Sequence, residues 1–237
     1  MILYFHRITK KVGTRDSYTF GDDIPIDDFI NGINSFRTKG YSFVSLEDYL
    51  DRPYPGNAIS LTFDDADVSL FEFGQEIKDL AIPITIFSPT AALKNGFYFD
   101  EAKFNAKHPY ARRIYKQLGP GLRALLYPDI NNRFSRSCLS MQHLEMLHRE
   151  LGSRFAVGGH GEHHIKHSWI NSLLVPNEIS ESFSYLTDQE FFFNGYAYPY
   201  GNASSFARKA LFESRYKYGF ATENGNNAIN FIRRNNG

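Results

Sequence analysis

The chain has 237 residues, of which 42% are hydrophobic and 16% aromatic, so it is long enough to bury a core within one α/β domain. Lysine and arginine number 26 together, as do aspartate and glutamate, and this balance excludes a strong overall attraction to nucleic acid or anionic membranes. The single cysteine, Cys138, excludes an internal disulfide framework and a cysteine-rich metal site.

The sequence contains no sign of a membrane span or of an export signal. No apolar run approaches the ~20 residues that a bilayer span requires, and the amino terminus lacks both a basic segment and a small-residue cleavage site. We therefore expect no membrane span and a cytoplasmic location, which agrees with the low cysteine content. The residue pattern does not indicate an oligomeric state.

Short apolar segments alternate with stretches of helical periodicity. The expected elements in chain order are a strand at 2–5, a helix around 29–36, strands at 41–44 and 58–63, a helix around 70–80, and strands at 84–87, 155–157, 191–196 and around Phe220. This rhythm indicates parallel strands joined by crossover helices, and six to eight such units would close into a barrel. The segment from about Pro89 to Ser140 departs from the rhythm and is interpreted as a partly helical insertion.

Two adjacent carboxylates, Asp64 and Asp65, follow the expected strand at 58–63 directly. The chemistry of α/β barrels normally lies at the carboxyl ends of the strands. Adjacent buried carboxylates repel each other, so a bound cation or a shared proton is the usual compensation. The alternative is that the pair begins a turn or caps the next helix.

Four of the eight histidines lie within residues 158–167, after another expected strand. Histidines four residues apart project from one side of a helical turn, so His160 with His164, or His163 with His167, could bind one ion. The glycine pair before His160 allows close approach of the backbone and favours the first pair. A solvated histidine-rich loop is the alternative.

Two histidines and one carboxylate would form a catalytic rather than a structural metal site. This ligand set leaves coordination positions open, so that a bound water can be activated and a carbonyl polarised at one centre. One aspartate of the pair then remains free to act as the general base.

A third motif, Tyr198-Pro199-Tyr200, follows the strand expected at 191–196. Tyrosine rings offer flat apolar surfaces with a hydrogen-bonding tip, which suit sugar rings, so these three residues are candidates for substrate binding. An ordinary turn with packing tyrosines is the alternative interpretation.

Together these segments resemble the polysaccharide deacetylases, the nodulation-protein-like homology domain of carbohydrate esterase family four. That family combines a Thr-Phe-Asp-Asp strand end, a His-x-x-x-His loop and a later aromatic-proline loop. The corresponding segments here are Leu3 to Arg7, Gly40-Tyr41, Ser45-Leu46, Thr62 to Asp65, Gly158 to His164 and Ala197 to Gly201. The resemblance implies a distorted (β/α) barrel of six to eight parallel strands, with residues 1–237 forming one catalytic domain.

The resemblance also implies an activity and the residues that perform it. Asp64 corresponds to the catalytic base, and Asp65, His160 and His164 correspond to the ligands of a divalent metal, with zinc as the default ion. The implied reaction is hydrolysis of N-acetyl groups on a carbohydrate, either a polysaccharide or a glycan precursor. Metal-bound water would attack the acetamide carbonyl.

The chain departs from the family pattern at three positions near these motifs. Ala66 stands where glycine is common, and Gly161 stands where serine or threonine commonly follows the first histidine. Ala197 replaces an arginine that orients the base in many members, and Arg233 or Arg234 is a candidate substitute.

The family's general acid is commonly a histidine near the carboxyl terminus, and this sequence has no histidine after His167. We therefore assign the acid to His6, at the end of the first expected strand, in a segment that resembles the openings of relatives with an amino-terminal histidine. A histidine with a purely structural role is the alternative.

Three other classes of function compete with the deacetylase. An inactive relative could retain the barrel to bind carbohydrate. An iron oxygenase could use the same ligand set, although its usual scaffold is antiparallel. A nucleic-acid-binding module could use the basic segment 103–123, but a solvated helix face explains that segment better, and we expect no nucleic-acid partner.

Overall fold

The computed structural model describes residues 1–10, 23–52, 56–99, 135–169, 172–222 and 229–233. The strands are β1 (Ile2–Phe5), β2 (Arg7–Thr9), β3 (Asp23–Pro25), β4 (Ser42–Phe43), β5 (Ala58–Asp64), β6 (Ile84–Ser88), β7 (Phe97–Phe99), β8 (Ser135–Ser137), β9 (Phe155–Gly159), β10 (Phe192–Ala197), β11 (Tyr218–Thr222) and β12 (Ile229–Arg233). The α-helices are α1 (Ile26–Thr38), α2 (Leu46–Asp51), α3 (Ser69–Glu72), α4 (Gly74–Leu80), α5 (Thr90–Asn95), α10 (Met141–Leu151), α11 (Val175–Leu186) and α12 (Ser205–Glu213).

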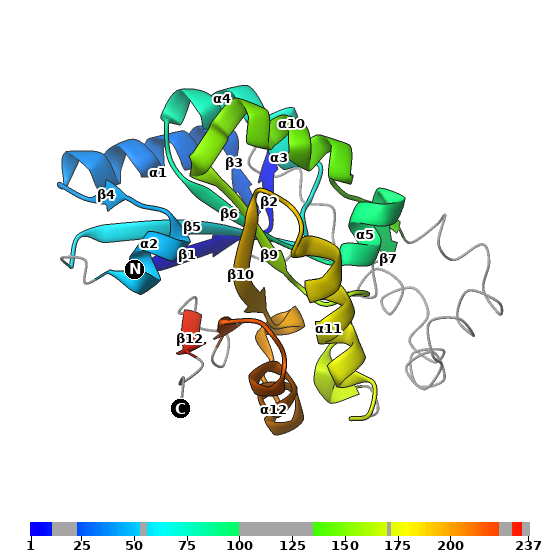
Figure 1. The fold of residues 1–237 in the computed structure, drawn as a ribbon. Coiled ribbons are helices and arrows are strands. Elements are labelled where there is room, and N and C mark those ends of the chain that lie inside the picture. Colours follow the sequence, from blue (N-terminus) through cyan, green and yellow to red (C-terminus); the bar gives the residue numbers. More distant parts are fainter. Residues whose placement is uncertain (11–22, 53–55, 100–134, 170–171, 223–228, 234–237) are drawn as a thin grey trace, which may run out of the picture.

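One eight-stranded sheet organises the molecule, with the order β1-β5-β6-β9-β10-β11-β12 and with β4 beside β5. The six strands from β1 to β11 along this path run parallel, and β12 is antiparallel to β11. The sheet curls into a half-barrel surrounded by helices (Figure 1). This confirms the expected single-domain α/β fold with a distorted barrel.

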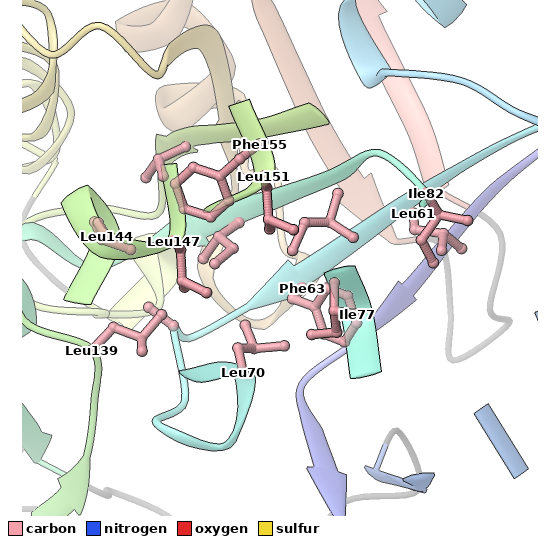
Figure 2. Close-up of a cluster of buried hydrophobic side chains, with 14 of the residues drawn as sticks. Leu61, Phe63, Leu70, Ile77, Ile82, Leu139, Leu144, Leu147, Leu151 and Phe155 are labelled. Carbon is pink, nitrogen blue, oxygen red and sulfur yellow. The ribbon is translucent and has the colours of Figure 1, made fainter. Parts of the chain in front are cut away.

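The central strands are apolar along their whole length because both faces of the sheet are covered. Residues 58–63 of β5 and all of β6 are buried. Helices α1, α4 and α10 lie side by side along one flank of the sheet (Figure 1). Their apolar stripes meet β5, β6 and β9 in the main hydrophobic cluster, where Phe63, Ile77, Leu147 and Phe155 lie together (Figure 2).

Two expected elements differ in detail from the structure. The helix expected around 70–80 is divided into α3 and α4, because Phe73 between them leaves the helical conformation, with φ −104° and ψ 21°. In the proposed insertion, α5 is followed by β7, which pairs with β8, whereas residues 100–134, including the basic segment 103–123, lie outside the described residues. None of the described helices combines the length and the apolar character needed to span a bilayer.

The end of β9 passes so close to its neighbours that we expect only glycine to fit there. A Cβ atom on Gly159 would lie 2.1 Å from the Tyr216 hydroxyl and 2.6 Å from the Ser182 hydroxyl. We therefore expect Gly159→Ala to lower the free energy of unfolding, measured with urea, by about 1–3 kcal/mol.

Gly32→Ala is the matched control, because Gly32 lies within α1 and has no atom within 4 Å of its hypothetical Cβ. We expect this variant to keep or gain stability, by up to about 1 kcal/mol from the better helix propensity of alanine. A free energy of unfolding equal to that of the wild type in Gly159→Ala would contradict the close contact of Gly159 with Tyr216 and Ser182.

Candidate metal centre and active site

The candidate catalytic residues lie along the carboxyl edge of the parallel sheet. Asp64 ends β5, Asp65 follows it, and His160 follows β9. His6 follows β1, whose last residue Phe5 pairs in register with Phe63, so that His6 comes next to Asp64 along the edge. Parallel register thus brings together residues that lie far apart in the sequence.

Asp65 lies between the imidazoles of His160 and His164. The Asp65 Oδ1 atom is 3.5 Å from His160 Nε2 and 3.0 Å from His164 Nε2. Asp65 and His160 are buried, and the candidate ligand atoms of the three residues all lie within 4.8 Å of one another. The structure therefore brings together the three residues predicted as metal ligands.

The geometry of this group fits a divalent ion. Zinc bonds of ~2.0–2.2 Å in a tetrahedral site separate neighbouring ligand atoms by roughly 3.3 Å, which is close to the separations around Asp65. His160 Nδ1 lies 2.8 Å from the carbonyl oxygen of Ala197 and, because a carbonyl only accepts, must donate a proton to it. Nε2 of His160 is therefore the ring nitrogen directed at Asp65, and it is the atom that would ligate an ion after losing its proton.

The histidine spacing does not reflect a helical turn, so this part of the sequence interpretation was wrong. Residues 160–164 form an irregular loop, in which Gly161 has φ 78° and His164 has φ 54°. These left-handed conformations turn the chain back toward Asp65, and the rings of His160 and His164 lie 4.8 Å apart. Gly161, where the family commonly has serine or threonine, provides conformational freedom at the first of the two positions.

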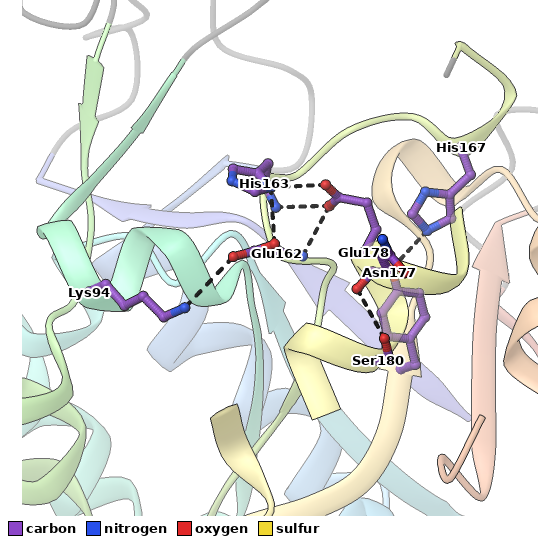
Figure 3. A network of polar contacts seen from close by, with 8 residues as sticks. Lys94, Glu162, His163, His167, Asn177, Glu178 and Ser180 are labelled. Atoms are coloured by element: carbon purple, nitrogen blue, oxygen red, sulfur yellow. Dashed lines mark hydrogen bonds and ion pairs between the residues drawn. The ribbon is translucent and has the colours of Figure 1, made fainter. Parts of the chain in front are cut away.

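The alternative pair, His163 and His167, does not converge on a common point. His163 Nδ1 lies 2.9 Å from Glu178 Oε1, whereas His167 Nε2 lies 2.7 Å from the Tyr196 hydroxyl (Figure 3). The sequence interpretation missed Glu178, although a glutamate within the apolar stripe of an amphipathic helix is a recognisable signal. It also missed the Ala197 carbonyl, for which the sequence contains no signal.

The two aspartates experience opposite electrostatic environments. Burial raises the pKa of Asp64, and the neighbouring imidazoles of His160 and His6 oppose this effect. Burial alone would also raise the pKa of Asp65, but the charge of His164 and the hydrogen bonds from His160 and His164 outweigh it and hold this pKa well below its usual value. The difference agrees with distinct roles for the two carboxylates.

The backbone of Arg233 does not lie at the carboxyl edge of the sheet, where a substitute for the arginine missing at Ala197 would be needed. In β12 Arg233 pairs with Tyr218, the first residue of β11. Arg233 therefore lies at the amino edge of the parallel strands, whereas Asp64 lies at their carboxyl edge. Arg234 and the Arg233 side chain lie outside the described residues. Within the part of the chain that the structure describes, no lysine or arginine forms an ion pair with Asp64.

The aromatic loop contributes one accessible side chain to this edge. Tyr198 and Pro199 are buried, whereas Tyr200 is 38% exposed. The Tyr200 ring lies 4.9 Å from that of His164, and its backbone is left-handed, with φ 60°. Of the three residues expected at the substrate, Tyr200 alone presents its side chain to solvent beside the histidine loop.

A half-barrel with two histidines and an aspartate at its carboxyl edge is an architecture suited to metal-assisted hydrolysis. The sequence matches no family model, and it matches no curated protein. Solved structures with the same fold include the deacetylase PplD from Streptococcus pyogenes in complex with acetate, at TM-score 0.67 and 17% identity over 96% of this chain and 84% of that chain.

A de-N-acetylase from Aggregatibacter actinomycetemcomitans has a TM-score of 0.67 at 16% identity, with 97% of this chain and 89% of that chain covered. A polysaccharide deacetylase from Bacillus cereus has a TM-score of 0.64 at 15% identity, with 98% of this chain and 59% of that chain covered. The chain therefore has the fold of the polysaccharide deacetylases.

The buried His167 provides a test of the loop electrostatics. Burial lowers the pKa of His167 to about 4, so the folded state keeps this ring neutral while the unfolded chain binds a proton below pH ~6.5. Stability should therefore fall as pH drops from 6.5 to 4, by at most about 1.4 kcal/mol per pH unit from this group.

The comparison is between the wild type and His167→Gln, both metal-free, by urea unfolding from pH 7 to pH 4. We expect the glutamine variant, which can still hydrogen-bond the Tyr196 hydroxyl, to lose less stability with acid. Parallel pH profiles for the two proteins would show that His167 is protonated in the folded state.

Proposed function

We propose that this chain is a metal-dependent hydrolase that removes N-acetyl groups from a carbohydrate. The observation that carries the proposal is the group of Asp65, His160 and His164 at the sheet edge, with Asp64 beside it. The deacetylase fold supports the reaction class, because neighbours of similar structure include a de-N-acetylase and a polysaccharide deacetylase. Zinc is the default ion for two histidines and one carboxylate.

Asp65, His160 and His164 would hold the ion. When bound, it would supply Lewis-acid chemistry, lowering the pKa of a water molecule and polarising the acetamide carbonyl. Asp64 would take the proton from the attacking water, since it adjoins Asp65 in the chain and faces the same edge. Burial of Asp65 and His160 keeps the ligands oriented and limits competing solvent.

His6 would protonate the departing amine. Its position next to Asp64 along the sheet edge supports this role. An amine is a poor leaving group until it is protonated, so the reaction requires an acid on the side of the scissile bond opposite the water. The products are acetate and a free amine.

An N-acetylated carbohydrate is the proposed substrate. Tyr200, exposed beside His164, offers an aromatic face of the kind that packs against sugar rings. The alternative of an inactive carbohydrate-binding relative is less well supported, because Asp64, Asp65 and both histidines are all present at one edge. Turnover separates the two possibilities.

The first test combines metal content with acetate release. Zinc-loaded protein should release acetate from N-acetylglucosamine oligomers. Asp64→Asn should retain the metal yet lose roughly 10²–10⁴-fold in turnover, because it removes only the proton acceptor. His164→Ala should lose the metal itself, measured by elemental analysis after dialysis.

Asp79→Asn is the matched control, since it makes the same chemical change on the exposed face of α4. It should behave as wild type in both measurements. Unchanged acetate release by metal-replete Asp64→Asn would remove Asp64 as the base, and full metal retention by His164→Ala would remove the proposed ligand set.

The second test concerns His6 and uses two substrates. We expect His6→Ala to keep its metal and to lose roughly 10²-fold or more in turnover of an N-acetyl sugar, in line with general-acid contributions. An activated aryl acetate should be affected far less, because its phenolate leaves without a proton. Equal losses on both substrates would indicate that His6 acts in binding or structure rather than as the acid.

A further inference from the structure

Glu178 is a buried carboxylate in a position where an apolar residue would be expected. It lies on α11 within the stripe that also buries Val175, Ile179 and Phe183, and it is only 6% exposed. A charged group in such a place is costly unless its oxygens are fully hydrogen-bonded. Its partners therefore indicate why it is there.

The three hydrogen bonds of the Glu178 carboxylate all go to the histidine loop (Figure 3). Its Oε2 atom accepts the backbone N–H of Glu162 at 3.1 Å and that of His163 at 2.9 Å. Its Oε1 atom lies 2.9 Å from Nδ1 of the His163 ring. One side chain thus engages two consecutive backbone amides between the proposed ligands His160 and His164.

The same loop is held from its other side by α5. The first amides of that helix donate to the loop carbonyls, from Thr90 N to Gly161 O at 3.1 Å and from Ala91 N to Glu162 O at 2.9 Å. The contacts on the α5 side are made by backbone amides and do not depend on a side chain, whereas the contact on the α11 side depends on a single carboxylate. The loop between the two proposed ligands is therefore clamped by one helix on each side.

We propose that Glu178 is a positioning residue for the metal centre: it holds the loop in the shape that brings His164 Nε2 to Asp65. This inference rests on the proposed function, because it assumes that His160 and His164 bind an ion. Gly161 has no side chain with which to brace the loop, so the bracing comes from α11. His164 itself stays in a left-handed conformation that the clamp helps to maintain.

The clamp also explains a second group of potential ligands, Glu162, His163 and Glu178. The Glu178 oxygens point at N–H donors, which repel a cation. We therefore assign this group to loop support, and we expect one bound ion per chain rather than two.

Removal of the carboxylate should weaken metal binding without removing a ligand. In Glu178→Ala two loop amides lose their acceptor and the loop can adopt other shapes, so the ligands converge less often. Outer partners of metal ligands typically contribute 10–100-fold to metal affinity, and we expect a loss of roughly that size in zinc affinity, measured by chelator competition. Glu178→Gln should restore most of it, since an amide oxygen can still accept both backbone N–H groups.

Two further variants separate positioning from general damage. Glu181→Ala removes an exposed carboxylate from the solvent face of the same helix and should leave zinc affinity unchanged. His163→Ala removes the ring contact but keeps both backbone contacts, so its loss should be smaller than that of Glu178→Ala. The absorption spectrum of the cobalt-substituted protein should change in Glu178→Ala and remain wild-type in Glu181→Ala.

A metal-free measurement completes the test. Amide hydrogen exchange at Glu162 and His163 should accelerate in Glu178→Ala. Exchange in the central strands β5 and β6 should stay slow, and this slow exchange would show that the variant still folds. Wild-type zinc affinity and cobalt spectrum in a folded Glu178→Ala protein would overturn the positioning role. The positioning role would also be overturned if the wild type bound two ions and Glu178→Ala lost only one of them.

The two proposals fail in different ways. Failure of wild-type protein to bind a divalent ion would overturn the proposed function and the positioning role together. Metal binding and acetate release by the wild type, combined with indifference to Glu178→Ala, would overturn the positioning role alone.

Discussion

The burial of the Asp65 carboxylate is the constraint on which the geometry of the site depends. Asp65 is only 4% exposed and follows a strand whose apolar residues are buried on both faces. A carboxylate in such surroundings needs compensating partners, which here are the imidazoles of His160 and His164. Both imidazoles come from one loop after β9, so that loop must turn back sharply toward the end of β5.

The cost of this turn appears in the backbone. Of the five described non-glycine residues with positive φ, the four other than Ala81 lie at the site, namely Asp65, Ala66, His164 and Tyr200. Left-handed conformations cost free energy for residues with a side chain and persist where the surroundings enforce them. Ala66 stands where the family commonly has glycine, and its φ of 52° gives the physical reason for that preference. The strain is thus concentrated where the chemistry is proposed.

The fold could be predicted from the sequence, and so could the position of Asp64, Asp65 and His160 at one edge of the sheet, because apolar runs that precede these residues mark strand ends whatever the intervening chain does. The shape of the histidine loop could not. Spacing of four residues suggested a helical turn, whereas the turn depends on positive φ at His164 and on contacts from α5 and α11. Tyr198 was expected at the substrate, but it is buried in a separate hydrophobic cluster with Tyr196 and Leu211. The residue types in a short loop do not reveal which side chains face the interior.

The support of the loop links the metal centre to packing at some distance from it. Glu178 reaches the loop from a helix that Ile179 and Phe183 pack into the hydrophobic cluster around Tyr196 of β10, where the Phe183 ring lies 5.4 Å from that of Phe192. A strand end is held by its ladder and can shift little, whereas a loop follows the elements that clamp it. The position of Asp65 is therefore set by the sheet and that of His164 by the docking of α11. The separation between these two proposed ligands therefore depends on how α11 packs against the half-barrel.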